Sequence, residues 1–388
     1  MPAATVLARS LLGTILATAS LLTANAQLQF DFDYSASTDF NDPAHGAARR
    51  SALEEAAASL ASIFDHTATI EIKVTSSNDP NGFTLAYASS AFVDTPVGFW
   101  QAVVMRKILT GIDDNGSAHD GEVNVNFGNP WDLDDDVSAD AYDFKSTVIH
   151  ELLHALGFYS DVWQDGTDAY GNPPGSPGVW QVFDKFLSDK DGTPVIDPVR
   201  FALDGSAWKL LSTGGTSPAA GLFFNGPAAT AANGGQPVGL YSPSVWEDGS
   251  SGSHLDDWNP ALTGLLMLSA ADTGGSRRSL SDIERGILQD LGYTLRPLPV
   301  PTLALLSITT SGVTQLELGG PPERWFAIEY SDDLNSWVEL QRHRLPQDPL
   351  VVEVELPEEA DARFLRTRKV PPPAAANALR APIPPHRR

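Results

Sequence analysis

The chain has 388 residues, of which 49 are acidic and 25 basic, and carries a formal net charge of −24. This acidic balance argues against nucleic acid as the main partner, because binding phosphates requires a basic surface. The absence of cysteine excludes a disulfide scaffold, thiolate metal ligands and a cysteine nucleophile. Because 42% of the residues are hydrophobic, the chain can build a real core, and its length predicts about two domains.

Residues 1–26 are typical of an export signal. Arg9 is their only charged residue, the apolar run Leu11–Leu22 follows it, and Ala24-Asn25-Ala26 has the small-x-small pattern of a cleavage site. The apolar run is shorter than the ~20 residues that a membrane-spanning helix needs. We therefore predict a cleaved signal peptide and a secreted protein, extracellular or periplasmic, without stable membrane insertion.

The next part of the chain alternates predicted helices and strands. Ala47–Phe64 is rich in Ala, Leu and Glu, which is typical of a helix. Ala68–Val74 and Gly121–Phe127 alternate apolar and polar residues and are predicted to be strands. Asp143–Leu156 has apolar residues at every fourth position, and Gly157 marks the expected end of this helix.

A long stretch with little regular structure is predicted after this helix. We expect an insertion at roughly 161–252, because most of this stretch is crowded with Gly, Pro, Ser and Asn. A further helix is predicted at Ser281–Leu291, where Ser281 and Glu284 have the spacing of a capping box. All these elements are assigned to one domain at 27–295.

The remainder of the chain changes character at a proline-rich linker, residues 296–301. Residues 302–369 carry short alternating segments such as Phe326–Tyr330 and are predicted to form a small β-sandwich-like module. Residues 370–388 form a basic tail rich in Pro and Ala that is predicted to be disordered. The expected fold class is α+β, with a mixed domain followed by a small all-β domain.

The motif with the clearest chemistry is His150-Glu151-Leu152-Leu153-His154, on the predicted helix. Histidines four residues apart differ by only about 40° around a helix axis, so both can reach one metal ion. Glu151 can accept a proton from a water molecule held on that metal. Zinc suits such a ligand set and tolerates an open position for water.

A catalytic zinc site needs a third protein ligand. The position six residues after His154 is Ser160, a poor ligand, and Asp161 is one position too late. No glutamate occurs between Glu151 and Glu247, so a glutamate on a nearby second helix is absent. His254 is the only histidine between His154 and His343, and spacing alone leaves it open whether it is a ligand or an exposed loop residue.

Ser146–Phe158, which contains the motif, resembles the active-site helix of metzincin zinc peptidases. The resemblance is closest to the leishmanolysin-like group, in which a large insertion separates the second and third histidines. Four later segments of the chain are similar to segments of that group, in the same order. These are Phe183–Leu187 within the insertion, Gly249–Asp256 with the third histidine, the methionine turn Leu266-Met267, and the closing helix Leu288–Tyr293.

The resemblance implies a metzincin-like zincin catalytic domain with His150, His154 and His254 as ligands of one zinc ion. It implies that Glu151 is the general base and that Met267 lies beneath the metal without binding it. The activity implied is that of a secreted zinc endopeptidase acting on protein or peptide substrates. Leishmanolysins are generally rich in cysteine, which this chain lacks, so the agreement is with cysteine-free bacterial relatives.

Two other functions remain open. One is a catalytically silent secreted surface-binding or adhesion protein that retains the metzincin fold, and the other is a zinc hydrolase of non-peptide amides. Glu151 argues against the silent protein, because binding alone requires no base beside the metal. By resemblance, an extended peptide would add to Gly121–Phe127 as an edge strand, although an ordinary paired strand fits these residues equally well.

Two groups of acidic residues could assist a metal. Asp132 and Asp134–Asp136 supply the oxygen ligands that a structural calcium ion prefers. Their spacing matches no EF-hand, and a solvated acidic loop is the favoured interpretation. Asp256 and Asp257 are predicted to orient His254 through a hydrogen bond.

Overall fold

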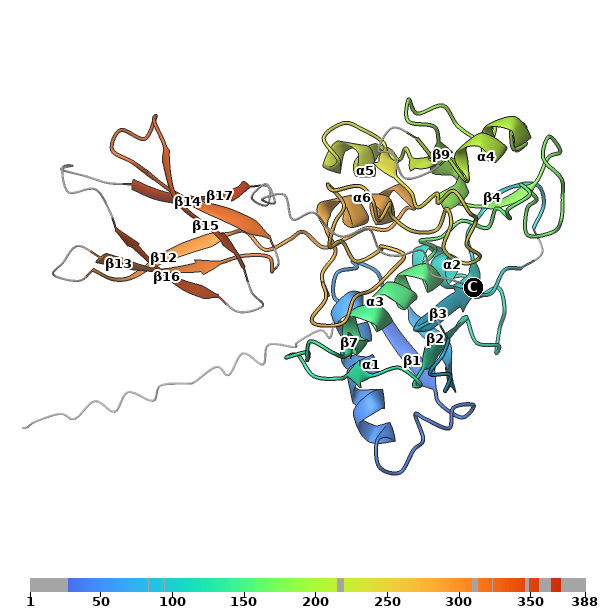
Figure 1. Ribbon diagram of the computed structural model, residues 1–388, viewed down its shortest axis with the longest axis horizontal. Coiled ribbons are helices and arrows are strands. Elements are labelled where there is room, and N and C mark those ends of the chain that lie inside the picture. The colour runs from blue at the N-terminus through green and yellow to red at the C-terminus, as the bar shows by residue number, and fades with distance from the viewer. Residues whose placement is uncertain are drawn as a thin grey trace, which may run out of the picture.

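The computed structural model describes residues 27–370 apart from 83, 94, 215–219, 309–312, 323, 346–348 and 356–363. The predicted signal peptide at 1–26 and residues 371–388 of the predicted tail lie outside the described residues. The described chain is a mixed α+β protein with several small sheets (Figure 1). Among its helices, none has both the length and the apolar character needed to cross a membrane.

The largest sheet has four strands in the order β1-β2-β5-β3. β1 (Gln29–Asp33), β2 (Thr69–Ser77) and β5 (Gly121–Asn126) run parallel, whereas β3 (Ala86–Ser90) runs antiparallel to β5. β2 turns its apolar residues to one face, so Ile70, Ile72 and Val74 are all completely buried. Alternation thus correctly predicted β2 and β5.

The pairing of β5 corrects one prediction. β5 hydrogen-bonds to β2 on one side and to β3 on the other. The interpretation of Gly121–Phe127 as an edge strand is therefore wrong, and these residues form an ordinary paired strand. Among the described strands, the edge on this side of the sheet is β3, which also contacts the helix that carries the motif.

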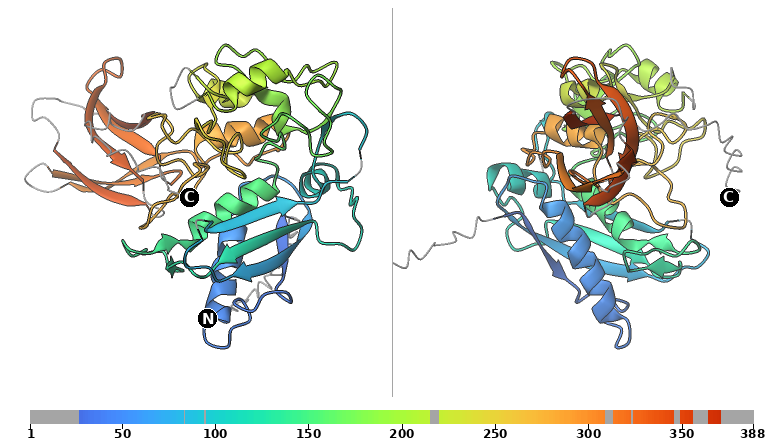
Figure 2. Two further views of the ribbon diagram at one scale, coloured as in Figure 1. Left: turned by 45° about the vertical axis from the view of Figure 1, so that its right-hand side comes forward. Right: turned by 90° about the vertical axis from the view of Figure 1, so that its left-hand side faces the viewer.

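Two helices pack together over one face of this sheet (Figure 2). α1 (Gly46–Ala61) presents a narrow apolar stripe that includes Ala52, Leu53, Ala56 and Leu60. α3 (Phe144–Ala155) is buried along most of its length. Both were predicted, although α1 ends about one turn earlier than expected.

The chain beyond α3 is built from short elements and loops around one longer helix, α6 (Asp282–Asp290). Ser281 and Glu284 form the predicted capping box, with both hydrogen bonds present. α6 packs closely on α5. The remaining elements of this half and of the sheet region are β4 (Gly98–Trp100), α2 (Val103–Thr110), β6 (Trp131–Asp132), β7 (Tyr142–Asp143), β8 (Val179–Gln181), the 3-10 helix Phe183–Phe186, β9 (Leu187–Ser188), α4 (Gly205–Leu211), β10 (Phe223–Phe224), α5 (Pro227–Ala232) and β11 (Val238–Gly239).

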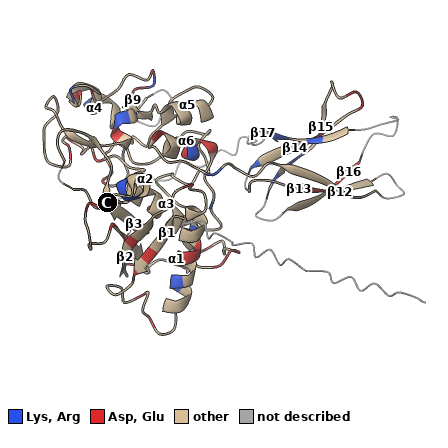
Figure 3. Cartoon of the chain, turned by 180° about the vertical axis from the view of Figure 1, so that it is seen from behind, with Lys and Arg blue, Asp and Glu red and all other residues tan. Residues whose placement is uncertain are grey.

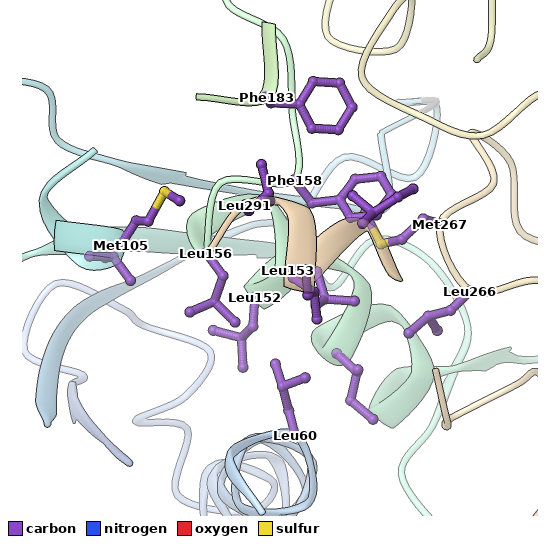
Figure 4. Packing of buried hydrophobic residues seen from close by; sticks show 14 of the residues in the cluster. Leu60, Met105, Leu152, Leu153, Leu156, Phe158, Phe183, Leu266, Met267 and Leu291 are labelled. Carbon is purple, nitrogen blue, oxygen red and sulfur yellow. The ribbon is translucent and has the colours of Figure 1, made fainter. Parts of the chain in front are cut away.

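A single hydrophobic core joins the sheet, its helices and the loop-rich half (Figure 4). Leu152 and Leu153 of α3 and Leu156, which directly follows it, lie in this core, where Phe183 of the insertion and Met267 are also completely buried. The loop-rich half therefore packs directly against α3. This packing can hold side chains of the loop-rich half in fixed positions beside the motif.

The last six strands form two antiparallel three-stranded sheets, β12-β13-β16 and β15-β14-β17. They have hydrophobic clusters of their own, separate from the main core. β17 carries several basic residues, which are visible in Figure 3. The strand bounds are β12 Thr302–Ile308, β13 Val313–Gly319, β14 Trp325–Ser331, β15 Val338–Arg344, β16 Leu350–Glu355 and β17 Phe364–Val370.

Candidate metal centre

α3 carries two of the three candidate histidines, and Asp143 fixes its first turn. The Asp143 carboxylate accepts a hydrogen bond from the Ser146 backbone N–H at 3.0 Å and from the Arg278 guanidinium at 2.9 Å. Asp143 is therefore the N-cap of α3, and the positive charge of Arg278 balances the negative charge of its carboxylate. From this start, 3.6 residues per turn place His150 and His154 on the same side of the helix.

The structure brings His254 to these two residues across about 100 positions of sequence. The Nε2 atoms of His150, His154 and His254 are 3.1 Å apart in each of the three pairs. Three nitrogens bound at 2.0–2.1 Å on a tetrahedral ion would lie about 3.3–3.4 Å apart. The arrangement is therefore compatible with one metal ion. It places His254, which is only 6% exposed, beside the other two histidines and not in an exposed loop.

Main-chain carbonyl oxygens fix the orientation of all three imidazole rings. Each Nδ1–H donates to a carbonyl, which leaves the Nε2 lone pair directed toward the other two rings. The three bonds are His150 to Leu266 at 2.8 Å, His154 to Phe158 at 2.7 Å and His254 to Ser250 at 3.0 Å.

The prediction that Asp256 and Asp257 orient His254 is wrong, because Ser250 takes that role. Asp257 instead accepts hydrogen bonds from Ser269, and Asp256 accepts one from the Trp258 backbone N–H. Both carboxylates are engaged by other donors, so proximity to His254 in the sequence was misleading.

Burial keeps the three histidines neutral. It lowers the pKa of His150, lowers that of His154 well below its usual value, and lowers the pKa of His254 to about 3. The neighbouring imidazoles act in the same direction on His154 and His254, because two positive charges so close together repel. Neutral imidazoles with converging lone pairs are the form that binds a metal.

Glu151 lies one residue from the first histidine and is also buried, with 7% of its surface exposed. Burial raises the pKa of its carboxyl to about 8, and the nearby Ala88 backbone N–H opposes this shift. Glu151 therefore lies near the edge strand β3, which contacts α3. A cation bound nearby would favour the ionised form of Glu151, which is the form that accepts a proton.

The loop that carries His254 is held by main-chain hydrogen bonds on both sides. Tyr241 donates to the His254 carbonyl at 2.8 Å, and its own carbonyl accepts from Gly252 at 2.8 Å. Gly252 has φ +79°, a left-handed conformation that favours glycine at this turn. On the other side, the Leu255 N–H donates to the Met267 carbonyl at 2.8 Å.

The other residues considered as third ligands have different roles. The Ser160 N–H donates to the Ser253 hydroxyl at 3.1 Å, and the Asp161 carboxylate accepts from the Gln181 side chain at 3.1 Å. Glu247 is exposed. Within the described part of the chain, the three histidines are the only group of three or more side chains placed to hold a metal ion together.

In the acidic loop considered as a calcium site, the Asp132 and Asp135 carboxylates already bind hydrogen-bond donors and basic side chains of the protein. Asp135 forms ion pairs with Lys145 at 2.9 Å and with Arg278. Asp132 accepts hydrogen bonds from the backbone N–H groups of Asp134 and Ser138, both at 3.1 Å. These contacts agree with the favoured interpretation of a solvated loop whose charges are balanced by nearby basic residues.

Comparison with protein-family models, with curated proteins and with solved structures gave no match. The described residues themselves define an α+β protein with a buried group of three histidines that could bind a metal ion. Sequence reasoning did not identify the roles of Ala88 and of the three carbonyl groups, because main-chain atoms leave no signature in residue type.

Proposed function

We propose that this protein is a secreted zinc-dependent endopeptidase of the leishmanolysin-like metzincin type. The observation that carries the proposal is the convergence of three neutral histidine nitrogens, 3.1 Å apart, beside a buried glutamate. Nitrogen ligands suit zinc, and three protein ligands with an open fourth position are typical of catalytic rather than structural zinc sites.

His150, His154 and His254 would hold the zinc ion through Nε2. When bound, zinc lowers the pKa of a water molecule and polarises the carbonyl group to be cleaved. Glu151 accepts the proton of the attacking water on its carboxylate and then delivers it to the leaving amine. The Ala88 N–H, near this carboxylate on the edge strand, favours its ionised form.

The free edge of β3 gives a peptide substrate a place to bind. Ala91 donates to Asp120, and Asn126 donates to the Leu85 carbonyl, so the odd-numbered residues of this stretch face β5. In an antiparallel pair of strands, the even-numbered residues that alternate with these point their backbone N–H and C=O groups away from β5. Ala88 therefore faces outward, and an extended peptide added along this edge would pass Glu151.

The replacement Glu151→Gln tests the mechanism, because it keeps the shape of the side chain and removes the base. We expect the variant to retain one zinc per chain while the rate of hydrolysis of an unfolded protein substrate falls at least about 100-fold. Zinc content is measured by atomic emission and cleavage by release of peptides. Glu353→Gln, the same change on an exposed strand of the β module, should leave both values unchanged.

Two results would contradict the proposal. Equal hydrolysis by wild type and Glu151→Gln would reject Glu151 as the base. A wild-type protein that binds zinc but cleaves no protein or peptide would instead favour the silent surface-binding alternative.

A further inference from the structure

Glu284 is a completely buried carboxylate at the start of α6, with 0% of its surface exposed. One oxygen, Oε2, accepts the Ser281 N–H at 2.6 Å and completes the capping box. The other oxygen, Oε1, accepts the Met267 N–H at 2.9 Å. A glutamate that only caps a helix has no need of the second bond or of complete burial, so the bond to Met267 requires a separate explanation.

The Met267 N–H belongs to the same peptide group as the Leu266 carbonyl. That carbonyl accepts the Nδ1–H of His150 at 2.8 Å. The Glu284 carboxylate and the His150 imidazole therefore bind the two ends of one planar peptide group. A change in the orientation of this peptide would alter both bonds together.

The next carbonyl along the chain extends the connection to the third histidine. The Met267 carbonyl accepts the Leu255 N–H at 2.8 Å, and Leu255 directly follows His254. Leu266 and Met267 are both buried in the main core, where Figure 4 shows them among the residues around α3. Glu284 thus fixes a segment that contacts His150 directly and supports His254 through its neighbour.

We propose that Glu284 is a positioning residue for the metal centre, acting on His150 through the Leu266–Met267 peptide group. Hydrogen bonds in a chain polarise one another, so a carboxylate on the N–H makes the carbonyl a stronger acceptor. A stronger acceptor on Nδ1–H fixes the ring and makes Nε2 a better metal ligand. This role rests on the proposed function only in requiring that the three histidines bind zinc.

The variant Glu284→Gln tests this role with little change in shape. A carboxamide has one acceptor oxygen, whereas two N–H groups point at Glu284, so one of the two bonds must be lost. We expect the zinc dissociation constant, measured by competition with a chelator, to rise about 10-fold. If Glu284→Gln gives too little folded protein, Glu284→Asp takes its place. Its side chain is shorter and cannot reach both N–H groups, so we expect the same rise in the zinc dissociation constant.

Asp290 provides a matched control on the same helix. Its carboxylate also accepts two backbone N–H groups, those of Ala228 at 2.8 Å and Ala229 at 2.9 Å, but it has no bond to the Leu266–Met267 peptide. Asp290→Asn should lower the melting temperature and leave the zinc dissociation constant within about twofold of wild type.

The outcomes separate this role from the proposed function. Equal zinc affinity of wild type and Glu284→Gln, or an equal loss in Glu284→Gln and Asp290→Asn, would overturn the positioning role and leave the zinc site intact. Failure of the wild-type protein to bind zinc would contradict the proposed function and the role of Glu284 with it.

Discussion

The buried carboxyl groups of this protein differ in the hydrogen bonds and ion pairs that offset the cost of their burial. Glu284 accepts two backbone N–H groups, and Asp143 is paired with Arg278. Asp184 is also completely buried and accepts the Gln181 N–H at 3.0 Å, but its Oδ1 has no hydrogen-bond partner among the described residues. Burial, with a contribution from the charge of Asp161, raises the pKa of Asp184 to about 7.

This raised pKa predicts how stability depends on pH. The folded protein binds the Asp184 proton more tightly than the unfolded chain, so ionisation of Asp184 lowers stability as the pH rises from about 4 to 7. Asp184→Asn removes this loss. We expect urea unfolding to show that the variant gains on the order of 2 kcal/mol relative to wild type between pH 5 and pH 8.

Asp197→Asn serves as the control for this measurement. Backbone hydrogen bonds from Arg200 and Val199 lower the pKa of the exposed Asp197, so it stays ionised throughout the range from pH 5 to pH 8. Its replacement should change stability by the same amount at both pH values. An equally flat difference for Asp184→Asn would show that the folded protein does not release the Asp184 proton between pH 5 and pH 8, contrary to the prediction.

At the scale of the secondary-structure elements, the start of α3 depends on one side chain. Asp143 caps the helix and also pairs with Arg278, which is itself largely buried. Among the described ion pairs, Asp143→Ala would leave Arg278 with the one to the exposed Asp135. We expect the free energy of unfolding to fall by about 3 kcal/mol, measured by chemical denaturation.

A second N-cap aspartate, which has no described ion pair like that of Asp143 with Arg278, separates the contribution of the cap from that of the ion pair. Asp204 caps α4 by accepting the N–H groups of Ser206 and Ala207, and it lies at the surface. Asp204→Ala should therefore cost only about 1 kcal/mol. Similar losses for the two variants would mean that the Arg278 pair adds nothing to the cap.

The elements with strong local patterns could be predicted from the sequence. α3, α6 and its capping box, β2 and β5 follow from apolar periodicity and from the Ser281–Glu284 spacing. The edge position of β3 could not, because neighbouring strands are chosen by tertiary packing and Ala86–Ser90 has little alternation of its own. The motif predicted two of the three histidine positions, and the resemblance implied the third, His254, which the packing of a distant loop brings beside them.

Over the whole molecule, the β module contacts the main body at the start of α6. The buried Arg324 donates to the Leu280 carbonyl and lies 3.3 Å from Asp282, and Lys369 also pairs with Asp282. Arg324→Ala would remove two of the charge-assisted contacts that hold the module against α6 and leave the pair of Lys369 with Asp282. We expect proteolysis of the linker at 296–301 to become about 10-fold faster, measured by limited digestion.

The control for this prediction is Arg342→Ala. Arg342 pairs with Glu339 inside the module and makes no described bond to the main body. Its replacement should leave the rate of linker cleavage unchanged. An unchanged rate for Arg324→Ala would mean that the Arg324 contact does not restrain the module.

Carbonyl groups of the main chain orient all three imidazole rings of the candidate metal centre, and this has a consequence for protein engineering. No side-chain replacement at Phe158, Ser250 or Leu266 can delete those acceptors. Libraries that randomise these three positions can therefore reshape the surroundings of the site while the imidazole orientations are preserved. A transplant of the centre into another scaffold must copy the path of the backbone, because grafting the histidines alone would leave their rings free to rotate.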